Sequence, residues 1–491
     1  MPVRRSVRRP PRRPAGRRAP RVLTAAALCA ALGAGAPAVA ATAPSAATAP
    51  PAATAPSAAT APPAATAPSA ATAPPAATAP PADAVQQPVG AEPLSAGRPA
   101  PRPAPPAAGP AASLTRPAAT AASDDAGKTV SYRGHTFTVP ADWPVVDLTA
   151  HPTACVRFDR HAVYLGDPGE QQDCPARVVG RTEALWLRPA TATKAAVTEN
   201  PTAREFRATA PADGIAVTAP YGADRATAER VLRSAGLPVA AARTEPPAAT
   251  PAAPALPADA TAHQGKGFDT CTAPGQSAMD AWKTASPYSA VGVYIGGVNR
   301  GCAQPNLTAE WVRTQYTAGW RFLPLYVGPQ PAAGAGSCAS DCAAVTDPVP
   351  QGRAAAEDAV AQAGTLGFGK GSVLYNDLEQ YTPGAALTAR VLGYLEAWTA
   401  RLHELGYRSG AYGSVSSLVA DLVAHAAGTT LPDVIHFARW NDEATLTDPV
   451  LPAALWADHQ RVHQYAGDRA ETYGGVRISI DRDLLDVGTG A

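Results

Sequence analysis

The stretch Leu374-Tyr375-Asn376-Asp377-Leu378-Glu379-Gln380 carries two carboxylates two positions apart in a short, mostly apolar run. Because side chains alternate between the two faces of a β-strand, Asp377 and Glu379 project from the same face, with Cα atoms roughly 7 Å apart. Two acids on one face repel each other, which drives their pKa values apart, as acid/base catalysis requires. Taken alone, the stretch also fits an edge strand with a solvated polar face.

Short β-rich runs and amphipathic stretches alternate on both sides of this stretch. The expected strands are Gly267–Cys271, Ala290–Gly296, Phe322–Val327, Ser372–Glu379, Ser409–Gly413, Val434–Trp440, Val462–Ala466 and Ile478–Asp481. The expected helices are Leu307–Ala318, Arg353–Leu366, Ala385–Leu405 and Val415–Ala426. This alternation predicts an α/β fold, a parallel (β/α)8 TIM-like barrel over residues 263–491. A doubly wound open sheet is the runner-up, although no phosphate-binding glycine motif follows any of these strands.

The active site of such a barrel lies at the carboxyl ends of its strands. The acids expected there are Asp269, Asp377, Glu379 and Asp481, and the aromatic residues are Trp440, Tyr294, Tyr326, Tyr412 and Tyr465. Aromatic faces stack on sugars, and carboxylates protonate a glycosidic oxygen or stabilise a cation. Each tyrosine alone is typical of core packing, but the set predicts a carbohydrate site that needs no metal or organic cofactor.

Four motifs also carry a family resemblance. Gly267-Phe268-Asp269, Val293-Tyr294-Ile295-Gly296-Gly297, Tyr375-Asn376-Asp377-Leu378-Glu379 and Ile478-Ser479-Ile480-Asp481 resemble the glycoside-hydrolase-like barrel family known as domain of unknown function 1906, over about residues 264–490. That family is similar to the family 25 lysozymes, which carry a first-strand Asp, an Asp-x-Glu on strand four, a Trp near strand six and a late Asp. The resemblance implies that Glu379 is the general acid and that Asp377 orients the substrate N-acetyl group or stabilises charge. It also implies that Asp269 and Asp481 tune pKa values or position water, and it places Trp440 at the site.

Three features depart from the lysozyme pattern. Thr270-Cys271 follows Asp269 where the lysozymes usually place a serine two residues on, the Ser337–Asp347 loop is an addition that could cover the site, and Asp483 adds an acid. The carboxylate spacing leaves retaining, inverting and substrate-assisted stereochemistry open.

The N-terminus has the features of an export signal. Nine arginines and no acid occupy residues 1–21, and an apolar Ala/Leu-rich segment follows that ends in Ala38-Val39-Ala40. This pattern predicts a secretory signal peptide at residues 1–40 and no stable membrane span. The paired arginines leave twin-arginine export open beside the general secretory route.

Composition predicts that residues 41–125 are a disordered stalk. Residues 41–82 repeat Ala-Thr-Ala-Pro-(Ser or Pro)-Ala seven times, without aromatic or charged side chains that could build a core. After cleavage the chain keeps 41 − 9 = 32 basic residues against 40 acids. Without a basic excess, nucleic-acid binding is not expected.

Six cysteines remain beyond the signal peptide, which favours disulfides in an exported chain. Cys155–Cys174 is the natural first pair because both residues lie in one predicted unit. The other four cysteines allow three connectivities, of which Cys338–Cys342 with Cys271–Cys302 is preferred. A zinc site at Cys338 and Cys342 lacks a second ligand pair.

A small β-rich domain of unknown role is expected at residues 128–239, before a Pro/Ala linker at 240–262. It should begin with a hairpin over Val130–Val139 that turns at Gly134, continue with strands at Val156–Leu165 and Arg181–Leu187, and close with a helix at Ala223–Ala235.

These features predict a secreted glycosidase that cleaves bacterial cell-wall glycan (peptidoglycan). Association of the secreted protein with the cell wall is left open. A catalytically inactive, carbohydrate-binding barrel is the alternative, and a structural wall protein is a third reading. The oligomeric state is left open.

Overall fold

The computed structural model describes residues 127–190, 195–210, 214–239, 243–244, 253–336, 338 and 342–490. The predicted signal peptide and stalk lie outside these residues. Within the described residues, no helix combines the length and the hydropathy needed to cross a bilayer. All of the described residues belong to one compact unit.

The β-rich part contains a hairpin and a seven-stranded sheet. β1 (Lys128–Tyr132) and β2 (His135–Val139) pair through the turn Arg133-Gly134, as the sequence predicts. The sheet has the order β3-β4-β5-β8-β7-β6-β9. Its strands are β3 (Val145–Asp147), β4 (Val163–Leu165), β5 (Leu185–Pro189), β6 (Ala196–Asn200), β7 (Glu205–Ala210), β8 (Ile215–Pro220) and β9 (Arg243–Thr244). Helix α1 (Arg225–Ser234) lies inside the predicted helix, whereas the predicted strand Val156–Leu165 is strand only over its last three residues.

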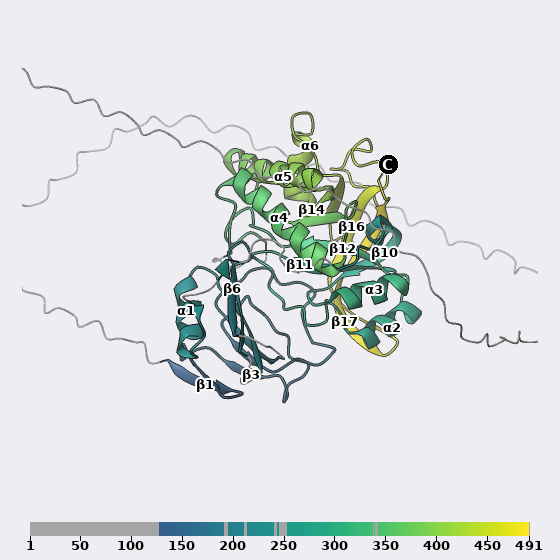
Figure 1. Ribbon diagram of the computed structural model, residues 1–491. Helices are drawn as coiled ribbons and strands as arrows, with labels where there is room; N and C mark the ends of the chain where they lie inside the picture. The colour runs from purple at the N-terminus through teal and green to yellow at the C-terminus, as the bar shows by residue number, and fades with distance from the viewer. Residues whose placement is uncertain are drawn as a thin grey trace, which may run out of the picture. The chain divides into compact units, whose positions relative to one another are not determined.

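The C-terminal part is a closed eight-stranded barrel, β10 to β17 in chain order (Figure 1). The strands are β10 (His263–Asp269), β11 (Ala290–Gly296), β12 (Arg321–Tyr326), β13 (Val373–Asp377), β14 (Arg408–Ser414), β15 (Val434–Ala438), β16 (Gln460–Tyr473) and β17 (Val476–Val487). The helical segments are η2 (Ala258–Thr261), α2 (Gln276–Ala285), α3 (Ala309–Thr317), α4 (Pro348–Leu366), α5 (Ala385–Leu405), η3 (Val415–Val419) and α6 (Ala420–Ala424). The predicted eight-stranded barrel is confirmed, and α2 is a helix that the sequence pattern did not indicate.

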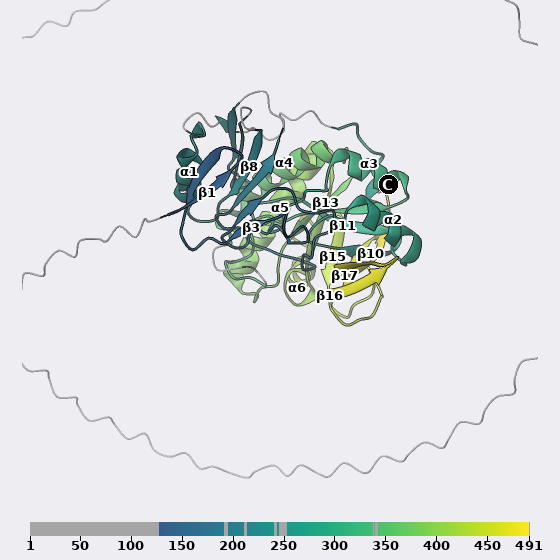
Figure 2. The ribbon, with the colours of Figure 1, turned by 90° about the horizontal axis from the view of Figure 1, so that it is seen from below.

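One strand departs from the all-parallel prediction. β17 runs antiparallel to both of its neighbours, β10 and β16. The reason is local: Gly474-Gly475 forms a two-residue turn with positive φ at both positions, and such a turn joins antiparallel strands directly. Figure 2 shows β16 and β17 as one long hairpin. The barrel therefore closes without a crossover helix between these two strands.

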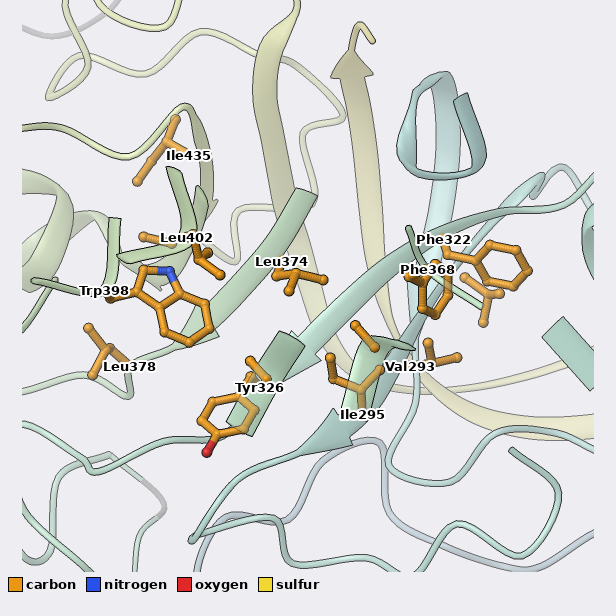
Figure 3. Packing of buried hydrophobic residues seen from close by; sticks show 14 of the residues in the cluster. Val293, Ile295, Phe322, Tyr326, Phe368, Leu374, Leu378, Trp398, Leu402 and Ile435 are labelled. Atoms are coloured by element: carbon orange, nitrogen blue, oxygen red, sulfur yellow. The ribbon is translucent and has the colours of Figure 1, made fainter. Parts of the chain in front are cut away.

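Two apolar layers hold the barrel together. Inward side chains such as Leu325, Tyr375 and Val462 pack in its interior, whereas outward side chains such as Phe322 and Leu374 pack against the helices. Figure 3 shows part of the outer layer, with Tyr326 and Trp398 in contact at a ring-centroid distance of 5.6 Å. Period-two alternation along each strand separates the layers.

Replacing Trp398 by Ala should lower the free energy of unfolding by about 3–5 kcal/mol, because its indole is fully buried between α5 and the barrel. Trp440→Ala is the matched control, since Trp440 is 45% exposed, and it should lower that free energy by less than about 1 kcal/mol. Urea unfolding of the two variants measures the difference. Equal losses would contradict the placement of Trp398 in the core.

Candidate active site

Asp269 and Asp377 each end a barrel strand and point into the barrel. Phe268 and Leu378, their chain neighbours, belong to the outer apolar layer, so alternation turns both carboxylates inward. Asp269 is fully buried, and its two oxygens accept hydrogen bonds from Tyr294 Oη at 3.1 Å and Gln464 Nε2 at 2.9 Å. Asp377 is 2% exposed, and its Oδ1 has no hydrogen-bond partner among the described residues.

Glu379 lies two residues beyond the end of β13, where it lines a cavity of about 570 Å³. Its backbone N–H donates to Gln330 Oε1 at 2.9 Å, and Gln330 Nε2 donates to the carbonyl of Asp377 at 2.9 Å. Gly336 approaches so closely that a Cβ there would lie 2.3 Å from Glu379 Oε2. The loop after β12 therefore packs against the acid, and only a residue without a side chain fits at position 336.

Asp481 reaches the same group of acids from the antiparallel strand. It pairs in register with Asp269, so the first half of β17 lies at the mouth where the parallel strands end. Its Oδ1 accepts a hydrogen bond from the backbone N–H of Asp468 at 2.6 Å. Asp481 thus reaches the predicted position although it lies inside a strand and not at its end.

Burial and mutual repulsion raise the pKa values of Asp269, Asp377 and Asp481. Burial raises the pKa of Asp269 to about 7, and Asp483 adds to the effect. Burial raises the pKa of Asp481 to about 8, with a contribution from Asp269. The pKa of Asp377 is held well above its usual value by burial first, and then by Glu379 and Asp269. The site therefore holds several carboxyl protons at neutral pH, which is the condition for proton donation.

Three of the predicted aromatic residues surround these acids. Gln464 links two of them, because its Oε1 accepts hydrogen bonds from Tyr412 Oη at 2.8 Å and Trp440 Nε1 at 3.0 Å. Tyr412 and Trp440 line the cavity with Glu379, and Tyr294 lies deeper, on Asp269. Trp440 is 45% exposed and offers an aromatic surface at the mouth.

Two predicted aromatic residues do not face the mouth. Tyr326 points outward between the inward residues Leu325 and Val327, and its hydroxyl donates to Asp358 of α4 at 2.9 Å. Tyr465 likewise points away from the interior, because its neighbour Gln464 faces Asp269. Their placement at the mouth is therefore wrong, since strand alternation decides the face and closeness to a strand end does not.

Arg177 is a site residue that sequence reasoning missed. It precedes the barrel by nearly 90 positions, yet its guanidinium lies 3.4 Å from Asp481 Oδ2 and 4.3 Å from the ring centroid of Trp440. Burial by itself would lower the pKa of Arg177, but the surrounding Asp481, Tyr412 and Glu379 raise it above its usual value. No motif marks this residue, so only the packing of the β-rich part on the barrel identifies it.

A second layer of polar residues lies below the mouth. Asp269, His436 and Asp483 bring ligand atoms within 4.8 Å of one another, and all three are buried. A divalent ion could be held by such a set, but His436 Nε2 already contacts Asp483 Oδ1 at 3.0 Å and Asp269 is hydrogen-bonded through both oxygens. Burial lowers the pKa of His436 to about 4, so the imidazole is neutral at pH 7.

The cysteine group Cys155, Cys174 and Cys302 offers no thiolates, because all three residues form disulfides.

The three disulfides join the predicted pairs Cys155–Cys174, Cys271–Cys302 and Cys338–Cys342. The first two lie side by side at the junction of the β-rich part and the barrel, and Val178 packs against them. The third packs in the interior layer with Tyr294 and Val179, next to the loop that contacts Glu379.

Comparison with protein families identifies the barrel. Residues 280–485 match the family described as Rv2525c-like, glycoside hydrolase-like domain. This part of the chain is a glycoside hydrolase-like domain. The match includes Asp377, Glu379, Trp440 and Asp481, whereas Asp269 and Arg177 precede it.

Solved structures similar to the glycoside hydrolase-like domain each cover 45% of this chain. They include a B. stearothermophilus protein (19% identity, TM-score 0.32, 95% of that chain) and the Tat-secreted protein Rv2525c of Mycobacterium tuberculosis in complex with L-tartrate (16%, 0.33, 96%). A third is the catalytic domain of endolysin ply40 from bacteriophage P40 of Listeria monocytogenes (11%, 0.28, 93%). Comparison with curated proteins gave no match.

The buried Asp481 should make the stability of the glycoside hydrolase-like domain fall as pH rises. Its pKa of about 8 in the fold exceeds the ordinary value of 3.8, so between these values the folded chain holds a proton that the unfolded chain releases. The contribution of protonated Asp481 to the free energy of unfolding is full below about pH 4 and is lost as the pH rises towards about 8. Asp481→Asn should remove up to roughly 1 kcal/mol of this loss per pH unit, measured by urea unfolding at several pH values.

Asp458→Asn is the control, because Asp458 is an exposed acid on the loop before β16. It should leave the pH dependence of stability unchanged. A steeper decline in Asp481→Asn than in the parent chain would show that Asp481 is ionised in the fold and would contradict the raised pKa.

Proposed function

We propose that this protein is a secreted glycoside hydrolase that cleaves bacterial cell-wall glycan (peptidoglycan), with Glu379 as the general acid. One observation carries the proposal: Glu379 opens onto a cavity beside the exposed ring of Trp440, while three further carboxyl groups lie buried behind it. A sugar-sized cavity with an acid and an aromatic surface suits glycoside hydrolysis.

In the proposed reaction, Glu379 donates a proton to the glycosidic oxygen as the bond from that oxygen to C1 breaks. Positive charge then develops on the sugar ring, and Asp377 stabilises it directly or by orienting the N-acetyl group of the substrate. Water adds to C1 and returns a proton to the carboxylate of Glu379, so the acid is regenerated. Asp269 and Asp481 retain their own carboxyl protons, in keeping with their raised pKa values, and so limit the negative charge of the acid cluster.

Recognition of the sugar is assigned to Trp440, Tyr412 and Tyr294. Trp440 and Tyr412 line the cavity from neighbouring strands, and Gln464 fixes both through its Oε1. Stacking of a pyranose ring on Trp440 would place its glycosidic oxygen near Glu379. Tyr294 acts from below by holding Asp269.

Export is part of the proposal. The arginine-rich, then apolar N-terminus has the order of a secretory signal, and the similar protein Rv2525c is Tat-secreted. Outside the cell, the predicted stalk of residues 41–125, which begins with the Ala/Thr/Pro repeat, would extend the folded part towards wall glycan.

A glycan-binding barrel without turnover is the second candidate. The close contact of Gly336 with Glu379 favours it, because the loop after β12 leaves that acid only 7% exposed. Binding at the aromatic mouth would then occur without proton donation.

Glu379→Gln decides between the two candidates. The purified full chain should release reducing ends from peptidoglycan, and the variant should be slower by at least about 100-fold, because the amide cannot donate the proton. Glu310→Gln is the control, since Glu310 is an exposed acid in the first turn of α3, and it should keep the parent rate. Retention of peptidoglycan by parent and variant without any release would support the binding barrel instead.

A further inference from the structure

The β-rich part of the chain contributes a charged side chain to the cavity of the barrel. Arg177 lies between the disulfide-bonded Cys174 and the strand-like contact of Val179 with Arg300. It lines the cavity together with Glu379, Tyr412 and Trp440. A site made by the barrel alone would lack this cation.

The segment that carries Arg177 is held firmly in place. The backbone N–H of Gly180 donates to the carbonyl of Asn299 at 2.8 Å, and Val179 packs in the interior layer of the barrel. On the other side, Val178 packs against the disulfides of Cys174 and Cys271. The guanidinium is therefore positioned before any ligand arrives, which lowers the entropy lost on binding.

The ion pairs of Arg177 are long. Its guanidinium is 3.4 Å from Asp481 Oδ2 and 3.9 Å from Asp468 Oδ2, whereas a strong charge-assisted hydrogen bond measures about 2.7–2.9 Å. Asp468 is well exposed, and Asp481, with a pKa of about 8, is largely protonated at neutral pH. Arg177 thus keeps both charge and hydrogen-bonding capacity for a further anion.

Arg439, the second arginine that lines the cavity, is already paired with an acid. Asp448 accepts hydrogen bonds from Nε and Nη2 of Arg439, the latter at 3.1 Å. Such a two-point contact neutralises the guanidinium. Apart from Glu379, the other polar groups of the lining, among them Gln380, Ser414 and Ser416, are uncharged.

We propose that Arg177 forms a carboxylate-binding subsite, so that this barrel selects glycans with an acidic substituent over neutral ones. A sugar bound against the exposed part of Trp440 would present such a substituent to the guanidinium, which covers one face of the same ring. The lactyl ether of N-acetylmuramic acid is a substituent of this class where its carboxyl group carries no stem peptide. The inference rests on the proposed function for the glycan class, but it concerns binding and not cleavage.

Two oligosaccharides of equal length test the subsite. One alternates N-acetylglucosamine with peptide-free N-acetylmuramic acid, and the other is chitin-derived and contains N-acetylglucosamine alone, so the lactyl ether with its carboxylate is the difference between them. Binding is measured by calorimetry on the full chain with Glu379→Gln, which prevents turnover. Adding Arg177→Gln should weaken binding of the acidic glycan by about 10- to 100-fold and binding of the neutral glycan by less than about 3-fold.

Arg188→Gln is the matched control. Arg188 belongs to the same β-rich part and lies 4.2 Å over the ring of Trp186, but it lines a different cavity. It should leave both affinities unchanged, and Arg177→Lys, which keeps the charge, should restore part of the acidic preference. Thermal unfolding of each variant shows whether the fold is retained.

Equal weakening of both glycans by Arg177→Gln would overturn the subsite and leave Arg177 a packing role. Tighter binding of both would also overturn it, because the guanidinium would then be covering the ring of Trp440. A carboxylate preference without any release of reducing ends by the parent chain would support the subsite while the glycosidase proposal fails. Release of reducing ends by the parent chain without a carboxylate preference would support the glycosidase proposal and overturn the subsite.

Discussion

The burial of carboxyl groups inside the barrel is the constraint on which the site depends. Asp269, Asp377, Asp481 and Asp483 are each at most 2% exposed, and a buried charge without compensation is strongly unfavourable. The protein meets this constraint by retaining protons, as the raised pKa values of Asp269 and Asp481 indicate. It also supplies hydrogen-bond partners: Tyr294 and Gln464 donate to Asp269, and the imidazole of His436 pairs with Asp483.

The same constraint explains the polar groups that have no role in packing. Gln464 contacts Asp269, Tyr412 and Trp440 at once, so the acid group and the aromatic mouth are fixed by one amide. Gln330 likewise fixes the backbone between Asp377 and Glu379, because its amide donates to the carbonyl of Asp377 and accepts from the N–H of Glu379. Loss of either amide would leave buried donors or acceptors unpaired, which is more destabilising than the lost hydrogen bond itself.

The β-rich part and the barrel depend on each other at the mouth. Two disulfides lie against each other at their junction, and Arg177 crosses it to reach Asp481 and Trp440. The barrel thus receives from the preceding part the cation that lowers the pKa values of Asp377 and Asp481 against the effect of burial. A passive spacer would not account for this placement.

The sequence alone predicted the strand periodicity, favoured the barrel over an open sheet, and favoured the disulfide pairs that the structure contains. Local alternation, spacing and short motifs also predicted the acids Asp269, Asp377, Glu379 and Asp481. The sequence did not determine which aromatic residues face the mouth, although counting alternate residues from Leu325 and Gln464 would have excluded Tyr326 and Tyr465. The antiparallel direction of β17 follows from the local Gly474-Gly475 turn. The contact of Gly336 with Glu379 and the position of Arg177 at the mouth are visible only in the tertiary structure. These depend on contacts between residues far apart in the chain, and no local pattern encodes such contacts.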